Sequence, residues 1–406
     1  MRLLDVSQEQ LVSFSKDRDE PELLTNLRKK AFLDFHRLPL PDDRIQEWRY
    51  TRIQELDLSP LVWTKTGDFI EIALLDGSAL PASVSLMPLA RAIKEKNSVS
   101  QHFGRIIPPT DKLTSLHYAF LNDSIYVKLD DDATFDRPLH ILLRARDPAR
   151  AAENAFVHLF LDVGDHVHAS ILFESDLSGP FNTVFLEMIA GEAAQVDFFT
   201  LQHDAEDTHS FAYRSVSLGV DARLRWYEGW FPRGKVRGKS RMIFSSPGAE
   251  GSLKSVFFAK GREQVQLLSE ALHRVPHTGG DIKNRGVLTG RASSIFQGRI
   301  VIDKKARDTS SFLDDKTLNL SPEAHSFSIP SLEIDADDVQ ASHGSTIGMV
   351  DEDELFYMMS RGLSAAEASS LLVMGFFDQL VGTIPEKDVQ ERFRKMILQR
   401  LGDARA

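Results

Sequence analysis

A repeat of 27 to 30 residues runs through the middle of the chain. Its units are a turn followed by an alternating run, and they begin GDHVHASI, GEAAQVDF, VDARLRWY, GAEGSLKS, KARDTSSF and DADDVQAS. Gly164, Gly191, Gly219 and Gly248 mark units that lie 27, 28 and 29 residues apart, and the interval around Gly279 fits one further unit. Short strands and a turn at this spacing are typical of stacked coils in a solenoid.

The runs between the turns have a two-residue period from about residue 136 to residue 348. In FVHLFLDVG, for example, Val157, Leu159, Leu161 and Val163 alternate with the other side chains. A period of two is that of a β-strand. We therefore expect a mostly β fold with a parallel β-helix core over residues 136–348, and a β-sandwich with frequent turns is the alternative.

Helical patterns flank this region on both sides. EPELLTNLRKKAFLDFHRL repeats apolar residues at three- and four-residue steps until PLPDD ends the helix. After Asp351 the helical period returns: Gly362 is expected to end a short helix, and Ser364 and Glu367 form a capping box for the next one. Residues from about 52 to 135 are mixed and give no clear assignment. The expected organisation is an N-terminal helical and mixed region (1–135), the β-helix core (136–348) and a C-terminal helical domain (349–406).

The helix ASSLLVMGFFDQLVG in the C-terminal domain is apolar over much of its circumference. A short terminal domain has little core of its own in which to bury such a helix. We expect it to dock, and both the β region and a partner protein are candidates for the surface that receives it.

Composition limits the chemistry of the 406-residue chain. Its formal net charge of −11 argues against nucleic acid as the main partner, because binding phosphates needs a basic face. The chain has no cysteine, which excludes disulfides, thiolate metal sites and a cysteine nucleophile within this polypeptide. The start MRLLDVSQEQ does not resemble a signal peptide, and no apolar run reaches membrane-spanning length. We expect a cytoplasmic protein that is not embedded in a membrane.

Histidines provide the candidate metal ligands. His166 and His168 are two residues apart on an expected strand, so both would face one side, and His158 or Glu174 could complete a divalent-metal site. The polar face of a solenoid explains the same residues more simply, because no further glycine and histidine pattern of the cupin type completes the set.

Other polar features have simpler interpretations. His273 and His277 flank Pro276 in an expected loop, where histidines are usually solvated. Gly286, Gly290 and Gly298 lack the strand–loop–helix setting of a phosphate loop and are expected at tight corners of the solenoid.

No serine–histidine–acid set and no recognisable pair of catalytic carboxylates is present, so the motifs do not support an enzyme. The two alternatives that we weigh are a carbohydrate-active β-helix enzyme, which would use acid pairs on the solenoid face, and a metal-binding β protein.

Several segments in order resemble the SufB/SufD family of iron–sulfur cluster assembly scaffold proteins. They are PLPDDRIQEWRYTRI, NRGVLTGRASSIFQGRIVID, PSLEIDADDVQASHGSTIG and SRGLSAAEASSLLVMGFFDQLV. The chain length and the segment from Glu47 to Thr51 resemble the SufD branch of the family more than the longer SufB branch. The resemblance covers the N-terminal helices and most of residues 280–385.

This resemblance implies a right-handed parallel β-helix with helical domains at both ends. It implies a non-catalytic subunit in a complex with a SufB-like scaffold subunit and a SufC-like ABC ATPase, and self-pairing as a homodimer is plausible for the isolated chain. The family motif is usually Cys-Ser-His-Gly, and its histidine is implicated in nascent cluster assembly together with a SufB cysteine. That role falls on His343, while Ala341 stands where the cysteine is usual.

The cluster implied by the resemblance is transient and shared with the SufB-like subunit, and none is held stably by the isolated chain. The SufC-like ATPase would dock on the helix from Ser364 to Gly382. The docking residues are expected to be Leu372, Met374, Phe376 and Phe377.

Overall fold

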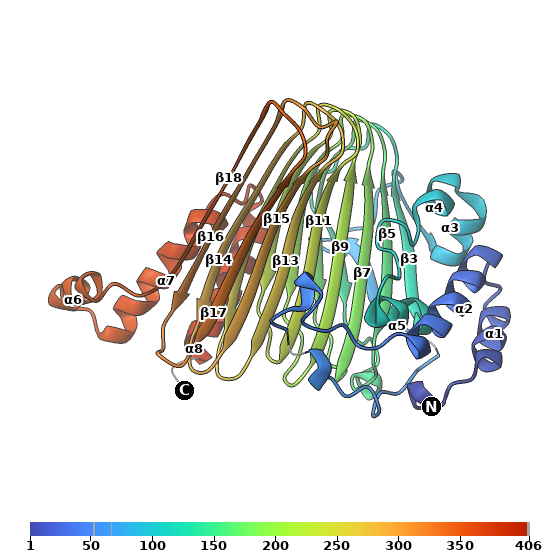
Figure 1. Cartoon of the computed structure of the whole chain (residues 1–406), viewed down its shortest axis with the longest axis horizontal. Helices are drawn as coiled ribbons and strands as arrows, with labels where there is room; N and C mark the ends of the chain where they lie inside the picture. Colours follow the sequence, from blue (N-terminus) through green and yellow to red (C-terminus); the bar gives the residue numbers. More distant parts are fainter. Residues whose placement is uncertain (52, 66, 404–406) are drawn as a thin grey trace.

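The computed structural model describes residues 1–51, 53–65 and 67–403, and over these ranges two nine-stranded sheets face each other in one long column (Figure 1). Sheet I has the order β1-β4-β6-β8-β10-β12-β14-β16-β18. Its strands are β1 Ile70–Leu74, β4 Leu139–Leu143, β6 His168–Ser175, β8 Gln195–Gln202, β10 Arg223–Trp230, β12 Glu250–Ala259, β14 Gly279–Leu288, β16 Thr309–Asn319 and β18 Val339–Met349. Sheet II has the order β17-β15-β13-β11-β9-β7-β5-β3-β2. Its strands are β2 Val84–Pro88, β3 Asp123–Leu129, β5 Phe156–Val163, β7 Phe181–Ala190, β9 His209–Leu218, β11 Lys235–Phe244, β13 Gln264–His273, β15 Ser293–Ile302 and β17 His325–Ile334.

From β5 onward the chain alternates between the two sheets, and each strand pairs in parallel with the strand two positions later. One strand from each sheet makes one coil, so the chain winds along the column as a parallel β-helix. This confirms the solenoid and excludes the sandwich, whose strands would be antiparallel. Antiparallel pairing occurs only at the start, between β1 and β4 and between β2 and β3, within the described strands. The further repeat unit that was expected near Gly279 is present, since β14 begins at Gly279.

The corners between coils explain the repeat seen in the sequence. Gly191 stacks directly on Gly164 of the previous coil, and a Cβ on Gly191 would lie 2.7 Å from the Gly164 carbonyl carbon. Only glycine allows the backbones to approach this closely. At the following corners the chain turns through left-handed residues, among them Asp221 (φ 53°) and Asp308 (φ 52°).

The three glycines expected at corners have two different structural roles. Gly290 is a corner residue with φ +67°, as expected. The expectation is wrong for Gly286 and Gly298, which lie inside strands β14 and β15. A Cβ on Gly298 would lie 2.0 Å from a methyl carbon of Leu313, so the glycine makes room for a side chain of the facing sheet.

Inward-facing side chains of both sheets form one apolar core along most of the column. The N-terminal helices cover the outer face of sheet II, where aromatic side chains of β5, β7 and β9 pack against them. These helices are α1 Gln8–Asp17, α2 Glu22–Arg37, α3 Leu89–Glu95, α4 Asn97–His102 and α5 Lys112–Phe120, with 3-10 turns at Leu3–Asp5, Gln46–Trp48, Ile53–Glu55 and Pro148–Arg150. The region 52–135, which the sequence pattern left open, therefore contains β1 to β3 and α3 to α5.

Three helices follow the last strand: α6 Glu352–Ser360, α7 Ala365–Val381 and α8 Lys387–Asp403. The predicted capping box is confirmed, because Glu367 N–H donates to Ser364 Oγ and Ser364 N–H donates to Glu367 Oε2. Helices α7 and α8 pack on the outer face of sheet I, where Phe377 is fully buried beside Phe258. Helix α6 projects away from the column (Figure 1). Among the described residues no helix combines the length and the apolar character needed to cross a bilayer.

Candidate functional site at the end of the solenoid

The column ends at β17 and β18, the last strands of the two sheets. No strand of the described chain pairs with the outer edge of either one. Apolar side chains remain exposed around this end, and the largest exposed fractions are those of Met349 (60%) and Phe327 (52%). Unpaired backbone groups beside exposed apolar side chains are typical of a surface that another chain covers.

His343 lies in the middle of β18, in register with Leu313 of β16. The same row continues through the earlier coils as buried core residues, namely Ile282, Leu253, Trp226, Phe198 and Ile171. His343 therefore occupies the core-facing position of the last coil. It is nevertheless exposed, because no further coil follows to cover it. A partner that extended the solenoid would place its own core-facing residue next to this imidazole.

Ala341 lies two residues earlier on the same strand, so its side chain faces the same side as His343. It is partly buried against the core of the solenoid. The position at which the family usually has a cysteine thus faces the same open end. In this chain it offers a methyl group instead of a thiolate.

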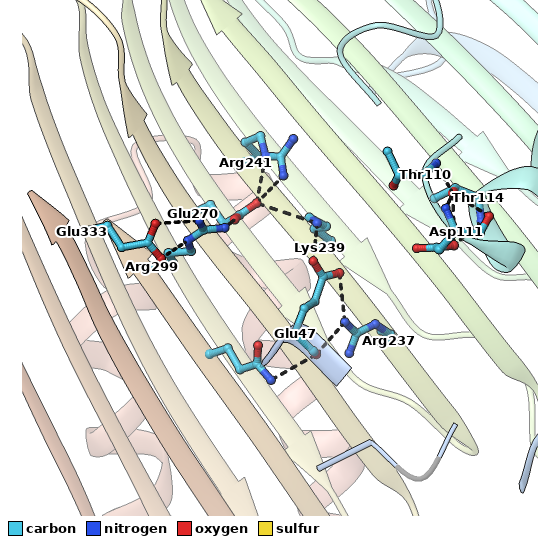
Figure 2. A network of polar contacts seen from close by, with 11 residues as sticks. Glu47, Thr110, Asp111, Thr114, Arg237, Lys239, Arg241, Glu270, Arg299 and Glu333 are labelled. Atoms are coloured by element: carbon cyan, nitrogen blue, oxygen red, sulfur yellow. Dashed lines mark hydrogen bonds and ion pairs between the residues drawn. The ribbon is translucent and has the colours of Figure 1, made fainter. Parts of the chain in front are cut away.

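A segment of the N-terminal region, which we call the strap (residues 42–51 and 53–56), crosses the outer face of sheet II toward the same end (Figure 1). Glu47 lies in the middle of the strap. Its carboxylate accepts hydrogen bonds from Arg237 (3.1 Å) and Lys239 (2.8 Å) of β11 (Figure 2). Burial raises the pKa of Glu47, but the two cations outweigh it and lower the pKa to about 2. The strap is therefore anchored by a carboxylate that stays ionised at neutral pH.

Further contacts carry the strap to the last coil. The Arg237 guanidinium lies 3.8 Å from the ring centroid of Trp48, and Gln297 of β15 donates to the Glu47 carbonyl. The ring of Tyr50 then stacks on Phe327 of β17 with an interplanar angle of 8°. Tyr50 thus forms part of the rim around the open end.

A row of alternating charges runs beside the strap across sheet II (Figure 2). Glu270 of β13 pairs with Arg241 of β11 (2.6 Å) and with Arg299 of β15 (3.2 Å). Arg299 in turn donates two hydrogen bonds to Glu333 of β17. The row ends on Glu333 at the edge strand, so this carboxylate is also presented near the open end.

The four residues of α7 that are expected to dock the ATPase fall into two groups by their burial. Phe377 faces the solenoid and is fully buried, whereas Leu372, Met374 and Phe376 are partly exposed. Further exposed apolar side chains lie on α6 and in the first half of α7, and sequence reasoning missed those of α6. They are Phe356 (72%), Tyr357 (58%), Met359 (43%) and Leu371 (52%).

The alternative metal site proposed for the early strands does not form. His166 is a left-handed corner residue (φ 55°), and only His168 lies on β6, so the two do not share a strand face. His158 is buried against His117 of α5, and Glu174 accepts hydrogen bonds from other histidines, His140 and His203. Within the described ranges, no group of three or more His, Asp or Glu side chains is arranged to hold a metal ion.

The two loop histidines also differ from each other. His273 is the last residue of β13 and is buried, with its ring stacked on Phe244 at 4.3 Å, so it is not the solvated loop residue that we expected. Burial lowers its pKa to about 4. His277 is exposed at a corner and contacts Asp308.

Comparisons with known proteins agree with this architecture. A family model described as "SUF system FeS cluster assembly, SufBD core domain" matches residues 146–376, which is more than half of the chain. The chain is 27% identical to the iron–sulfur cluster assembly protein SufD of Bacillus subtilis over 432 aligned residues, which cover 97% of this chain and 98% of that protein. It is 26% identical to an iron–sulfur cluster assembly SufBD family protein of Mycobacterium leprae (92% and 94% covered) and 23% identical to one of Synechocystis (93% and 91% covered). The chain belongs to the SufBD family of iron–sulfur cluster assembly proteins.

Proposed function

We propose that this chain is a non-catalytic scaffold subunit of a cytoplasmic SUF complex, with a SufB-like subunit and a SufC-like ABC ATPase as its partners. The observation that carries the proposal is the open end of the solenoid, where two long edge strands and His343 lie together. The SufB-like subunit is proposed to cover this end with its own solenoid, which would pair the free edges of β17 and β18. Two isolated copies of this chain would use the same end to form a homodimer.

His343 is the proposed contribution of this chain to the nascent cluster. A chain without cysteine has no thiolate to offer, and thiolates are the usual ligands of iron–sulfur clusters. An imidazole can replace a thiolate on a cluster iron. We therefore assign the thiolate ligands to the SufB-like partner and one nitrogen ligand to His343, so that the cluster is transient and shared between subunits.

The C-terminal helices are the proposed docking surface for the ATPase. Helix α6 has no buried residue and presents Phe356, Tyr357 and Met359, which Leu372, Met374 and Phe376 of α7 would extend. Phe377 belongs to the opposite, solenoid-facing side and is assigned to anchoring α7. Amphipathic or exposed apolar helices of this kind typically fill a hydrophobic groove on a partner.

Contacts between α7 and sheet I provide a rigid connection from that surface to the solenoid. Arg285 of β14 donates to Gln379 of α7, and Tyr227 of β10 donates to the carbonyl of Thr383, in the turn just after α7. A movement of the ATPase on binding ATP would therefore turn the solenoid as a body. Such a rotation would open the proposed interface at its end.

The experiment is co-purification of the tagged chain with its two proposed partners, combined with cluster delivery in cells. We expect both partners to be retained at physiological salt, and we expect the isolated chain to show neither ATP hydrolysis nor a stable cluster. His343→Ala should impair cluster delivery with the complex still assembled. His325→Ala, which changes another exposed histidine at the start of β17, is the matched control and should behave as the wild type. Failure to retain either partner, or normal iron–sulfur enzyme activity with His343→Ala, would contradict the proposal.

A further inference from the structure

One core-facing row of the solenoid changes from apolar to polar along the column. On sheet I it begins with Phe173 and Thr200 and continues through Glu228. In the last four coils the same row contains only short polar side chains and one carboxylate, namely Ser255, Asn284, Asp315 and Ser345. The first three of these four residues are fully buried. The interior near the open end is therefore polar along this row, beside the apolar row that ends at His343.

Three oxygens of this row have no hydrogen-bond partner among the described residues. They are Ser255 Oγ, Asn284 Oδ1 and Asp315 Oδ2. The other polar atoms are engaged, since Asn284 Nδ2 donates to Asp315 Oδ1 at 2.6 Å. Buried oxygens without a partner are rare because each one costs free energy. Of the three, Asp315 Oδ2 lies nearest the open end and carries a carboxylate, so it is the one most suited to a ligand from outside the protein.

The charge of Asp315 also has no cation in contact within the core. Arg285 faces outward, where it pairs with the neighbouring Asp314 at 2.6 Å. Two other buried carboxylates have an arginine in contact: Glu228 pairs with Arg214 at 3.2 Å, and Glu270 pairs with Arg241. A third, Asp204, has no cation in contact but accepts hydrogen bonds from Ser175, Gln202 and Ser210. Burial raises the pKa of Asp315, and hydrogen bonds from Asn284 and Ser328 and the charge of Arg285 only partly oppose this effect. A carboxyl group in such a place is stabilised either by a proton or by a bound cation.

The facing strand supplies further oxygens at the same level. Ser328 of β17 lies beside the Asp315 carboxyl group and lowers its pKa, and Ser345 Oγ donates to Ser328 Oγ at 2.7 Å. Asp315, Ser328 and Ser345 therefore bring one carboxylate and two hydroxyl groups together at the last coil. Carboxylate and neutral oxygens are the ligands that hard cations prefer.

We propose that this cluster binds one hard cation of Na⁺ or Ca²⁺ size between β16 and β18, with Asp315 Oδ2, Ser328 Oγ and Ser345 Oγ as ligands. Adjacent strands lie about 4.8 Å apart, which leaves room between β16 and β18 for an ion with bonds of about 2.4 Å. This length suits Ca²⁺, with bonds of about 2.3–2.6 Å, and Na⁺, whose radius is similar, but it is too long for Mg²⁺ at about 2.0–2.1 Å. With a single carboxylate the expected dissociation constant is roughly 0.1–1 mM.

The bound ion would tie the exposed last coil to the buried coil beneath it. Strands β17 and β18 are much less buried than β14 and β16, so they depend more on such a link. Ser345 is two residues from His343 on the same strand face, and a ligand at Ser345 would also restrict the position of the imidazole. The site lies within one chain, so its occupancy does not depend on any partner.

The test measures ion binding to the whole chain after dialysis into choline chloride. Thermal unfolding is followed as CaCl₂, NaCl or MgCl₂ replaces choline at constant ionic strength, and calorimetric titration with CaCl₂ gives the stoichiometry. We expect a saturable rise in Tm with Ca²⁺ or Na⁺, a smaller rise with Mg²⁺, and one Ca²⁺ site per chain. If Na⁺ acts and Ca²⁺ does not, the site selects the monovalent ion, which also supports the proposal.

Two sets of variants connect the binding to the cluster. Asp315→Asn should abolish the saturable rise, whereas Asp314→Asn, which removes the outward-facing neighbour, should keep it. If Asp315→Asn does not fold, Ser345→Ala and Ser328→Ala replace it and should each weaken binding by roughly tenfold or more. The proposal is overturned if no ion gives a saturable rise, or if both the Asp315 and the serine variants bind as the wild type does. In the first case the buried carboxyl group holds a proton in place of a metal ion.

Discussion

Replacing Glu47 with Gln tests how firmly the strap is attached to the solenoid. The change keeps the size of the side chain but removes the charge that compensates Arg237, which is only 4% exposed. Folding lowers the pKa of Glu47 from 4.5 to about 2. Since one pKa unit corresponds to about 1.4 kcal/mol, the ionised carboxylate contributes about 3 kcal/mol. Removing one partner of a buried ion pair typically costs about 3–5 kcal/mol, and the value obtained from the pKa lies at the lower end of this range.

The assay is urea unfolding at pH 7, together with hydrogen exchange of residues 42–56. We expect Glu47→Gln to lose about 3 kcal/mol and its strap amides to exchange faster. Glu333→Gln is the matched control, because Glu333 also pairs with an arginine but both side chains are about 40–45% exposed, so its loss should stay below about 1 kcal/mol.

The pH dependence has a definite sign. Because folding lowers the pKa of Glu47, its contribution is complete above pH 4.5 and is lost as the pH falls toward 2. The difference between wild type and Glu47→Gln should therefore shrink between pH 5 and pH 3. Equal stabilities of Glu47→Gln and Glu333→Gln at pH 7 would refute the reasoning.

Two further substitution pairs test the core and the C-terminal helices. In a urea titration, Gly298→Ala should destabilise the solenoid by about 1–3 kcal/mol, because the added methyl group would clash with Leu313. Gly344→Ala is the control and should leave the stability unchanged, because no atom beyond its chain neighbours lies within 4 Å of the added methyl group. Phe377→Ala should cost about 3–5 kcal/mol and loosen α7 in hydrogen exchange, because this side chain is fully buried. Phe356→Ala should leave the stability unchanged and weaken retention of the ATPase in a pull-down; the opposite pattern for the two phenylalanines would contradict the assignment of the helix faces.

The sequence predicted the solenoid because its physical cause is local. Stacked corners need glycine or a left-handed residue once per coil, and the strands between them need one apolar face, so both requirements appear as a period. The capping box of α7 could be predicted for the same reason, since Ser364 and Glu367 are three residues apart. Gly286 and Gly298 were misplaced because the side chains that they accommodate come from distant parts of the chain or from the facing sheet.

The parts of the site that sequence reasoning missed all depend on distant pairing. Glu47 and Arg237 are 190 residues apart, so no local pattern connects them. The core-facing position of His343 follows only from its register with Leu313, and the isolation of Asp315 follows only from the absence of a facing cation among the described residues. The exposed face of α6 was missed because an apolar helix pattern does not reveal whether the fold supplies a partner for it.

The most direct test of the scaffold role uses the absence of cysteine. Ala341→Cys introduces the only thiol of the chain, on the same strand face as His343. In a complex with the SufB-like subunit, oxidation should link the introduced thiol to the partner by a disulfide, and a maleimide should label it much more slowly than in the isolated chain. If the complex assembles while this thiol forms no link and is labelled at the same rate as in the isolated chain, the open end of the solenoid is not the subunit interface.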